Sequence, residues 1–240
     1  MHIPVEIKDL CLTLRDGLIA ALGDKLYGLY VYGAAAFPDG APTGDVDFNV
    51  ILMEQLRKRE HAAILELHRR LAVEYPPLGV GLDGYYLLLA EARCREYPTH
   101  QLRPEMFDNS WALHRAHILA GRCIVLHGPD PKTIFPPASW LELERDLYGE
   151  LKYVQDHLAD YPDYCILNLC RILYSFEYQN VVISKFAAAG WAHERYPRWQ
   201  RHIELAKRSY AGLAGPDERQ FMLAEVDKLF DFVSVLVSPE

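Results

Sequence analysis

The alternation of hydrophobic and polar positions changes character along the chain. In its first part, the apolar residues form short runs rich in aromatic and aliphatic side chains, at 25–32, 45–52 and 79–89, which predict three strands. Two stretches with helical spacing, 5–22 and 56–75, lie before the first run and between the last two. The order helix, strand, strand, helix, strand predicts an α/β or α+β domain, and of the two we expect α+β with a small mixed sheet.

The second part of the chain is predicted to be helical. Helical spacing returns at 111–120, and residues 123–126 form a short predicted strand. From residue 139 onward the pattern predicts helices only, at 139–158, 163–178, 184–192, 199–211 and 216–237. We place the boundary at the turn before Pro162, which predicts an N-terminal domain over 1–158 and a helical bundle over 159–240.

Composition and charge narrow the possible functions. Lys and Arg total 25 against 33 Asp and Glu, a net charge of -8, whereas a protein that binds nucleic acid would more often present a basic face. No apolar run approaches the ~18 residues of a membrane span, and the N-terminus lacks the pattern of a secretory signal. We therefore expect a cytoplasmic protein with neither a nucleic acid nor a membrane as partner; the oligomeric state stays open.

The residues with the clearest chemical meaning are Gly33-Ala34, followed after ten residues by Asp45-Val46-Asp47. Side chains alternate along a strand, so Asp45 and Asp47 face the same way, with their Cα atoms about 7 Å apart. Two neighbouring carboxylates repel each other unless a cation lies between them. Mg²⁺ is typically held by one or two carboxylates together with substrate phosphates, which points to a nucleoside triphosphate.

Two further features support a nucleotide site. The turn at Gly33 follows a predicted strand and enters the Ala34 segment, where its backbone N–H groups would face phosphates. Asp83, on the third predicted strand, is a third carboxylate that would act as a metal ligand or as the base for an attacking hydroxyl. Both roles stay open at this point, as does the alternative that Asp83 is a turn residue beside Gly84.

Other candidates carry less weight. His114 and His117 lie one helical turn apart without an acidic partner, so we interpret them as ordinary helix residues rather than metal ligands. Phosphate binding needs Lys or Arg, and Lys185, Arg201 and Lys207 are our candidates for neutralising the triphosphate from the helical domain. The alternative for each of these three is a solvated surface charge.

These residues resemble a known family. The pattern of Gly33-Ala34 and Asp45-Val46-Asp47 is similar to the Gly-Ser and Asp-x-Asp motif of the polymerase-β-like nucleotidyltransferases. Further segments resemble the aminoglycoside adenylyltransferases of the streptomycin and spectinomycin type, in order along the chain: 29–33, 127–129, 134–136, 167–175, 184–192 and 206–210. The resemblance implies a nucleotidyltransferase domain and a helical domain, with ATP and Mg²⁺ bound between them and AMP passed to a drug hydroxyl.

Carried over by position, the resemblance makes Asp45 and Asp47 metal ligands and Gly33 the glycine of the phosphate loop. Asp83 stands where the family has its catalytic glutamate, and its side chain is one methylene shorter. Ala34 replaces the family's serine, which removes a hydroxyl contact to the triphosphate worth about 1.5–3 kcal/mol.

The acceptor side departs further from the family. The two acidic positions that the family uses to hold its cationic drug are Phe186 and Gly190 in this chain. Trp111 is a loose candidate for the aromatic platform that the family presents to its drug. The nucleotide half of the site is therefore mostly present, whereas the acceptor half is altered.

From these observations we predict an enzyme, a Mg²⁺-dependent nucleotidyltransferase that moves AMP from ATP to a hydroxyl of a small molecule, with an aminoglycoside-like acceptor as one possibility. An alternative is a catalytically degenerate nucleotide-binding or scaffold protein of the same fold, which Ala34 and the short Asp83 would explain. A nucleotidyltransferase acting on nucleic acid is a third alternative, disfavoured by the acidic charge.

Overall fold

A computed structural model describes residues 3–39, 45–106 and 108–238. It divides the chain into two compact units, Met1–Ala138 and Ser139–Glu240. This boundary differs from the expected one after residue 158, because helix α5 (Trp140–His157) packs against the next helix, α6 (Pro162–Tyr178), and belongs to the helical unit. Pro162 occupies the first turn of α6, where its missing N–H needs no partner, so it begins a helix without ending a domain.

The first unit contains a four-stranded sheet in the order β3-β2-β1-β4. Its strands are β1 (Leu26–Val31), β2 (Val46–Leu52), β3 (Leu82–Leu88) and β4 (Ile124–His127). Strands β2 and β3 are parallel, whereas β1 is antiparallel to both β2 and β4. The predicted small mixed sheet is confirmed.

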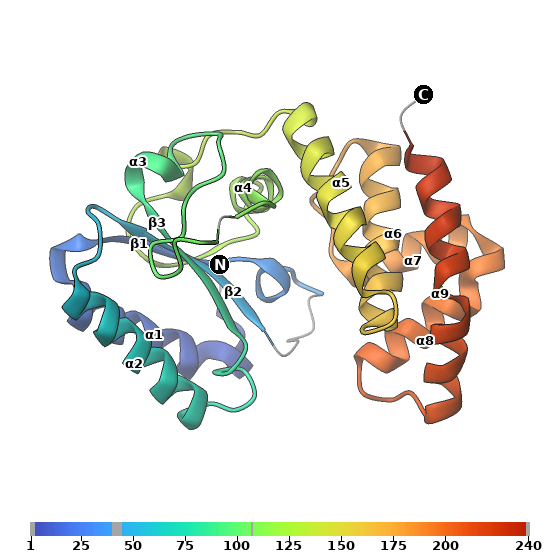
Figure 1. The fold of residues 1–240 in the computed structure, drawn as a ribbon, viewed down its shortest axis with the longest axis horizontal. Helices are drawn as coiled ribbons and strands as arrows, with labels where there is room; N and C mark the ends of the chain where they lie inside the picture. Colours follow the sequence, from blue (N-terminus) through green and yellow to red (C-terminus); the bar gives the residue numbers. More distant parts are fainter. Residues whose placement is uncertain (1–2, 40–44, 107, 239–240) are drawn as a thin grey trace. The chain divides into compact units, whose positions relative to one another are not determined.

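Helices cover both faces of this sheet (Figure 1). Helices α1 (Val5–Leu22) and α2 (Lys58–Glu74) lie side by side on one face, while α3 (Leu89–Ala92) and α4 (Trp111–Leu119) lie over the other. Three short 3₁₀ turns complete the unit at Gly23–Lys25, Gly33–Ala36 and Pro131–Thr133.

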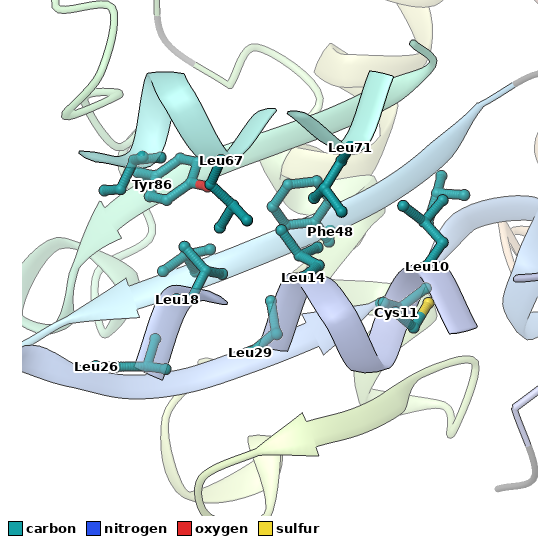
Figure 2. Packing of buried hydrophobic residues seen from close by; sticks show 14 of the residues in the cluster. Leu10, Cys11, Leu14, Leu18, Leu26, Leu29, Phe48, Leu67, Leu71 and Tyr86 are labelled. Atoms are coloured by element: carbon teal, nitrogen blue, oxygen red, sulfur yellow. The ribbon is translucent and has the colours of Figure 1, made fainter. Parts of the chain in front are cut away.

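The core between the sheet and the first two helices is built from leucines and aromatic rings. Figure 2 shows Leu14 of α1 and Leu71 of α2 beside Phe48 on the sheet, and Leu18 of α1 in the same cluster. These four side chains are completely buried. At roughly 1.5–3 kcal/mol for each buried side chain of this size, the cluster holds β2 firmly in place.

The opposite face of the sheet combines aromatic and polar side chains. Tyr30, Tyr32 and Trp111 are buried there in a second cluster. The indole Nε1 of Trp111 donates a hydrogen bond to the carbonyl oxygen of Cys94 at 3.2 Å. Trp111 is therefore a core residue, and it does not form a surface platform for a ligand.

The second unit is a helical bundle around α6, which packs against α5, α7 (Lys185–Arg195), α8 (Gln200–Tyr210) and α9 (Pro216–Val237). A single 3₁₀ turn, Pro197–Trp199, precedes α8. The helices predicted from residue 139 onward are present, with shifts of a few residues at some ends. In the described part of the chain, no helix is both long enough and apolar enough to cross a membrane.

Candidate active site

The candidate carboxylates come from adjacent strands. Asp47 on β2 and Asp83 on β3 are directly paired in the parallel register, and the N–H of Val46 donates to the carbonyl of Gly81 at 2.8 Å. Paired residues of neighbouring strands direct their side chains to the same face, with their backbones roughly 5 Å apart. Asp45 directly precedes β2 and is exposed. The structure therefore places Asp83 within a strand beside Asp47, not in a turn.

Gly33 lies against the Asp47 carboxylate. The N–H of Tyr32 donates to the carbonyl of Asp47 at 3.0 Å, which brings the end of the β1 segment next to β2. A Cβ atom added to Gly33 would lie only 1.7 Å from Oδ2 of Asp47, and the φ of Gly33 is +67°. Space and backbone conformation both require glycine here. Ala34 follows in the same 3₁₀ turn and is half-buried.

The electrostatic environment around these carboxylates is acidic. Desolvation raises the pKa of Asp83 above the ordinary carboxyl value, the charges of Asp45 and Asp108 raise it further, and His114 lowers it. Burial, together with the charges of Asp108, Asp47 and Asp83, raises the pKa of the Tyr32 phenol well above its usual value. Several negative charges thus meet on one sheet face, which favours a bound cation.

The structure adds Asp108, which the sequence analysis missed, and shows that Asp108 is an acidic partner of His114. Asp108 is buried, and its carboxylate accepts a hydrogen bond from the N–H of Ser110 at 3.0 Å. The other carboxylate oxygen lies 2.7 Å from Nδ1 of His114, whose ring packs on Tyr32 with centroids 4.8 Å apart. The irregular segment around Asp108 has no periodicity that would have identified this pair.

The second histidine of that helix has a different environment. His117 is buried and packs edge-on against Phe37, with ring centroids 5.4 Å apart. The two histidines of α4 therefore contact different groups, and the expectation that neither has an acidic partner is wrong for His114.

The carboxylates can be tested for their fit to Mg²⁺. In the described ranges, no three side chains of His, Cys, Asp or Glu are grouped as a preformed metal site. The donors at this sheet end are carboxylate oxygens, with Asp47 paired to Asp83 across two strands. Since Mg²⁺ usually takes one or two carboxylates and completes its coordination with phosphates and water, Asp45, Asp47 and Asp83 fit an ion that arrives with a nucleotide.

The predicted cations lie in the helical unit. Nζ of Lys185 lies 4.2 Å from the Tyr164 ring centroid and donates to the hydroxyl of Tyr210 at 3.3 Å. Lys207 lies 5.9 Å from the ring of Phe186, which in turn contacts Tyr210. Lys185 and Lys207 therefore border one aromatic cluster.

The third cation is held elsewhere in the same unit. The guanidinium of Arg201 stacks on Phe221 of α9 at 4.2 Å. The structure therefore brings Lys185 and Lys207 to one aromatic cluster, whereas Arg201 contacts another ring. Gly190, one of the two altered acceptor positions, has open space where a side chain would be, because an added Cβ meets nothing within 4 Å.

Comparison with known proteins gives one family and one fold. Residues 133–235 match the family described as aminoglycoside adenylyltransferase, C-terminal domain. The spectinomycin adenyltransferase AAD(9) from Enterococcus faecialis, solved with ATP and spectinomycin, superimposes with a TM-score of 0.70 at 17% identity, over 91% of this chain and 97% of that one. The chain therefore has the fold of AAD(9), and its residues 133–235 resemble the C-terminal domain of the aminoglycoside adenylyltransferases. A search of curated proteins found no match.

This finding confirms the predicted resemblance and fold class. The family match covers most of the helical unit and includes Lys185, Arg201 and Lys207. Asp45, Asp47 and Asp83 lie outside the matched residues, in the part of the chain for which the likeness to AAD(9) is one of fold. The roles of individual site residues therefore rest on the geometry described above.

Proposed function

We propose that this protein transfers AMP from ATP to a hydroxyl group of a small molecule in a Mg²⁺-dependent reaction. The observation that carries the proposal is the pairing of Asp47 with Asp83 across parallel strands, with the Gly33 backbone directly against the Asp47 carboxylate. A phosphate-facing turn and paired hard oxygen ligands are what a metal-bound triphosphate needs.

The residues have distinct roles in this proposal. Asp45 and Asp47 hold Mg²⁺, which when bound offsets the negative charge of the phosphates. Backbone N–H groups of Gly33 and Ala34 face the phosphate oxygens. The acceptor oxygen forms a bond to the α-phosphorus, the bond from that phosphorus to the β-phosphate oxygen breaks, and pyrophosphate leaves. Asp83 takes the hydroxyl proton, a role that its raised pKa favours.

The comparisons support a small-molecule acceptor. AAD(9), which shares the fold, was solved with both a nucleotide and a small hydroxylated molecule. The acceptor of the present chain is proposed to differ from streptomycin, because Phe186 and Gly190 supply no carboxylate for a polycation. Lys185, Arg201 and Lys207 are proposed to neutralise the triphosphate.

Binding without turnover is the second candidate. Ala34 offers no hydroxyl to the phosphates, and Asp83 is shorter than a glutamate. These two positions favour a protein that binds nucleotide but transfers nothing. The close fit between Gly33 and Asp47 argues for retained chemistry, because a protein that no longer uses the carboxylate has no need to keep it there.

Thermal unfolding with ATP and Mg²⁺, compared with ATP and a chelator and with Mg²⁺ alone, tests the nucleotide half of the proposal. We expect stabilisation only when ATP and Mg²⁺ are both present, since a ligand that binds the folded state raises the unfolding midpoint. No shift at millimolar nucleotide would contradict the proposal. Mass spectrometry of AMP adducts over a panel of aminoglycosides and other polyols then tests transfer, and stabilisation without any adduct would favour the degenerate alternative.

A further inference from the structure

Asn49 is a polar residue of β2, and the other residues of this strand after Asp47 are apolar. It is completely buried, and both its amide nitrogen and its amide oxygen are without a hydrogen-bond partner among the described residues. An asparagine amide has two donor hydrogens and two acceptor lone pairs. Leaving a buried donor or acceptor unsatisfied destabilises a protein by about 1–3 kcal/mol, so this position needs a partner that a protein group does not supply.

The position of Asn49 connects it to the candidate active site. It lies two residues after Asp47 on β2, so the two side chains share one sheet face and their Cα atoms are about 7 Å apart. Its partner in the register of β3 is Tyr85, which lies two residues after Asp83. Asn49 and Tyr85 therefore form the next pair along the sheet behind Asp47 and Asp83.

The groups around this pair are polar as well as aromatic. The register of β1 places Tyr30 opposite Asn49, and the hydroxyl of Tyr30 donates to the carbonyl of Pro129 at 2.9 Å. Burial raises the pKa of the Tyr85 phenol above its usual value, and the charges of Asp108, Asp83 and Asp47 raise it further. The carboxylates thus act on the same region of the sheet face that contains Asn49.

We infer that Asn49 is a positioning residue, which holds a buried water behind Asp47 and Asp83 and so keeps the two carboxylates turned toward the metal and nucleotide. Buried waters typically make about three hydrogen bonds to otherwise unsatisfied groups. The amide of Asn49 supplies one or two of them, and a carboxylate oxygen of Asp47 or Asp83 supplies another. The positioning role of Asn49 rests on the proposed function. The presence of the water can be observed whether or not the protein transfers AMP.

The substitution Asn49→Leu tests this role because leucine has the same branched arrangement of heavy atoms as asparagine and no hydrogen-bonding atoms. The variant should still fold cooperatively in the ligand-free state, because the amide and its water are replaced by apolar atoms of the same branching. The affinity for Mg²⁺ with a non-hydrolysable ATP analogue, measured by calorimetry, should fall about 10–100-fold, as is usual for groups that orient metal ligands. Turnover should fall through kcat, with little change in KM for the acceptor.

Two further variants separate a positioning role from packing. Ile51→Leu changes a buried side chain two residues farther along the same face and should leave metal–nucleotide affinity unchanged. Asn49→Ser keeps a hydrogen-bonding atom and should lose less affinity than Asn49→Leu. Equal losses in the two Asn49 variants, or wild-type affinity in Asn49→Leu, would overturn the inference. If Asn49→Leu does not fold, the comparison of Asn49→Ser with wild type decides: unchanged affinity in Asn49→Ser then overturns the inference.

A crystal structure of the ligand-free wild type provides a readout independent of activity. We expect a water within hydrogen-bond distance of both the Asn49 amide and a carboxylate oxygen of Asp47 or Asp83. An Asn49 amide without such a water would overturn the inference. If the water is present but the wild type binds no Mg²⁺–nucleotide, the proposed function has failed and the structural assignment of Asn49 stands.

Discussion

The two units of this protein place their charged side chains in different ways. In the sheet unit, Asp47 and Asp83 are short side chains on adjacent paired strands, so the backbone hydrogen bonds of the sheet determine where the carboxylates lie. In the helical unit, Lys185 and Lys207 are long side chains that rest on aromatic rings. A carboxylate on a strand is positioned by the fold itself, whereas a lysine on a helix depends on its neighbours.

The family match and the candidate chemistry also fall in different units. The match covers 133–235, which includes most of the helical unit, while the paired carboxylates lie before it. A similar helical bundle indicates a shared fold, but the identity of a substrate depends on a few side chains. The acceptor positions Phe186 and Gly190 illustrate this, because they lie within the matched residues and still differ in chemistry from the family's acidic positions.

The largest effect is expected from Asp47→Asn, which tests whether the sheet unit carries the reaction. The amide is a weaker metal ligand than the carboxylate, and losing several kcal/mol of charge stabilisation should lower AMP transfer by about 10³-fold or more. The unfolding midpoint without ligand should stay close to the wild-type value. Asp24→Asn, at an exposed position of the same unit, is the matched control. Transfer near the wild-type rate would remove Asp47 from the mechanism.

Asp83→Asn should lower transfer by about 10²–10⁴-fold if Asp83 is the base. The free energy of unfolding, in contrast, should increase at neutral pH. The pKa of Asp83 is raised in the folded state, so its ionised form destabilises the fold at neutral pH, and the wild type regains this stability as the pH falls into the acid range. The variant should therefore unfold at a higher temperature than the wild type at neutral pH, with a difference that disappears at low pH. A constant difference at every pH would contradict the assignment.

Gly33→Ala tests the contact between the turn and the Asp47 carboxylate. The added Cβ would overlap Oδ2, and alanine disfavours the positive φ by about 1–2 kcal/mol. Because a displacement of about 1 Å near the chemistry can lower the rate by 10²-fold, transfer should fall by about that factor. Gly149→Ala, in the exposed interior of α5, should instead stabilise the protein by about 0.8–1.0 kcal/mol and leave transfer unchanged. Similar behaviour of the two variants would show that Gly33 has no special role.

A smaller effect is expected in the helical unit from Gly190→Asp. The position has room for a side chain, and a carboxylate there should improve the affinity for a cationic aminoglycoside such as streptomycin on the order of tenfold, as one hydrogen bond to a charged group does. Ala187→Asp, an exposed position on the same helix, is the control for added negative charge. Calorimetric titration measures both. Equal gains in the two variants would mean that Gly190 does not mark the acceptor position.

Several features could be predicted before the structure was known, because they depend on local patterns. Helical spacing located most helices of the second unit to within a few residues. The alternation that puts Asp45 and Asp47 on one face stays a prediction, because Asp45 precedes β2. The structure divides the chain after Ala138, whereas the pattern places the boundary after residue 158, because a proline can end one helix or begin the next.

Residues distant along the chain come together only through the tertiary structure. The register that pairs Asp47 with Asp83, the contact of Gly33 with that carboxylate, and the Asp108–His114 pair all join separate segments. The sequence by itself determined the elements and the types of side chain available for catalysis, because periodicity and residue chemistry are local properties. The tertiary structure decided which side chains meet and which polar groups, such as the Asn49 amide, are buried without a protein partner among the described residues, because those depend on packing between distant segments.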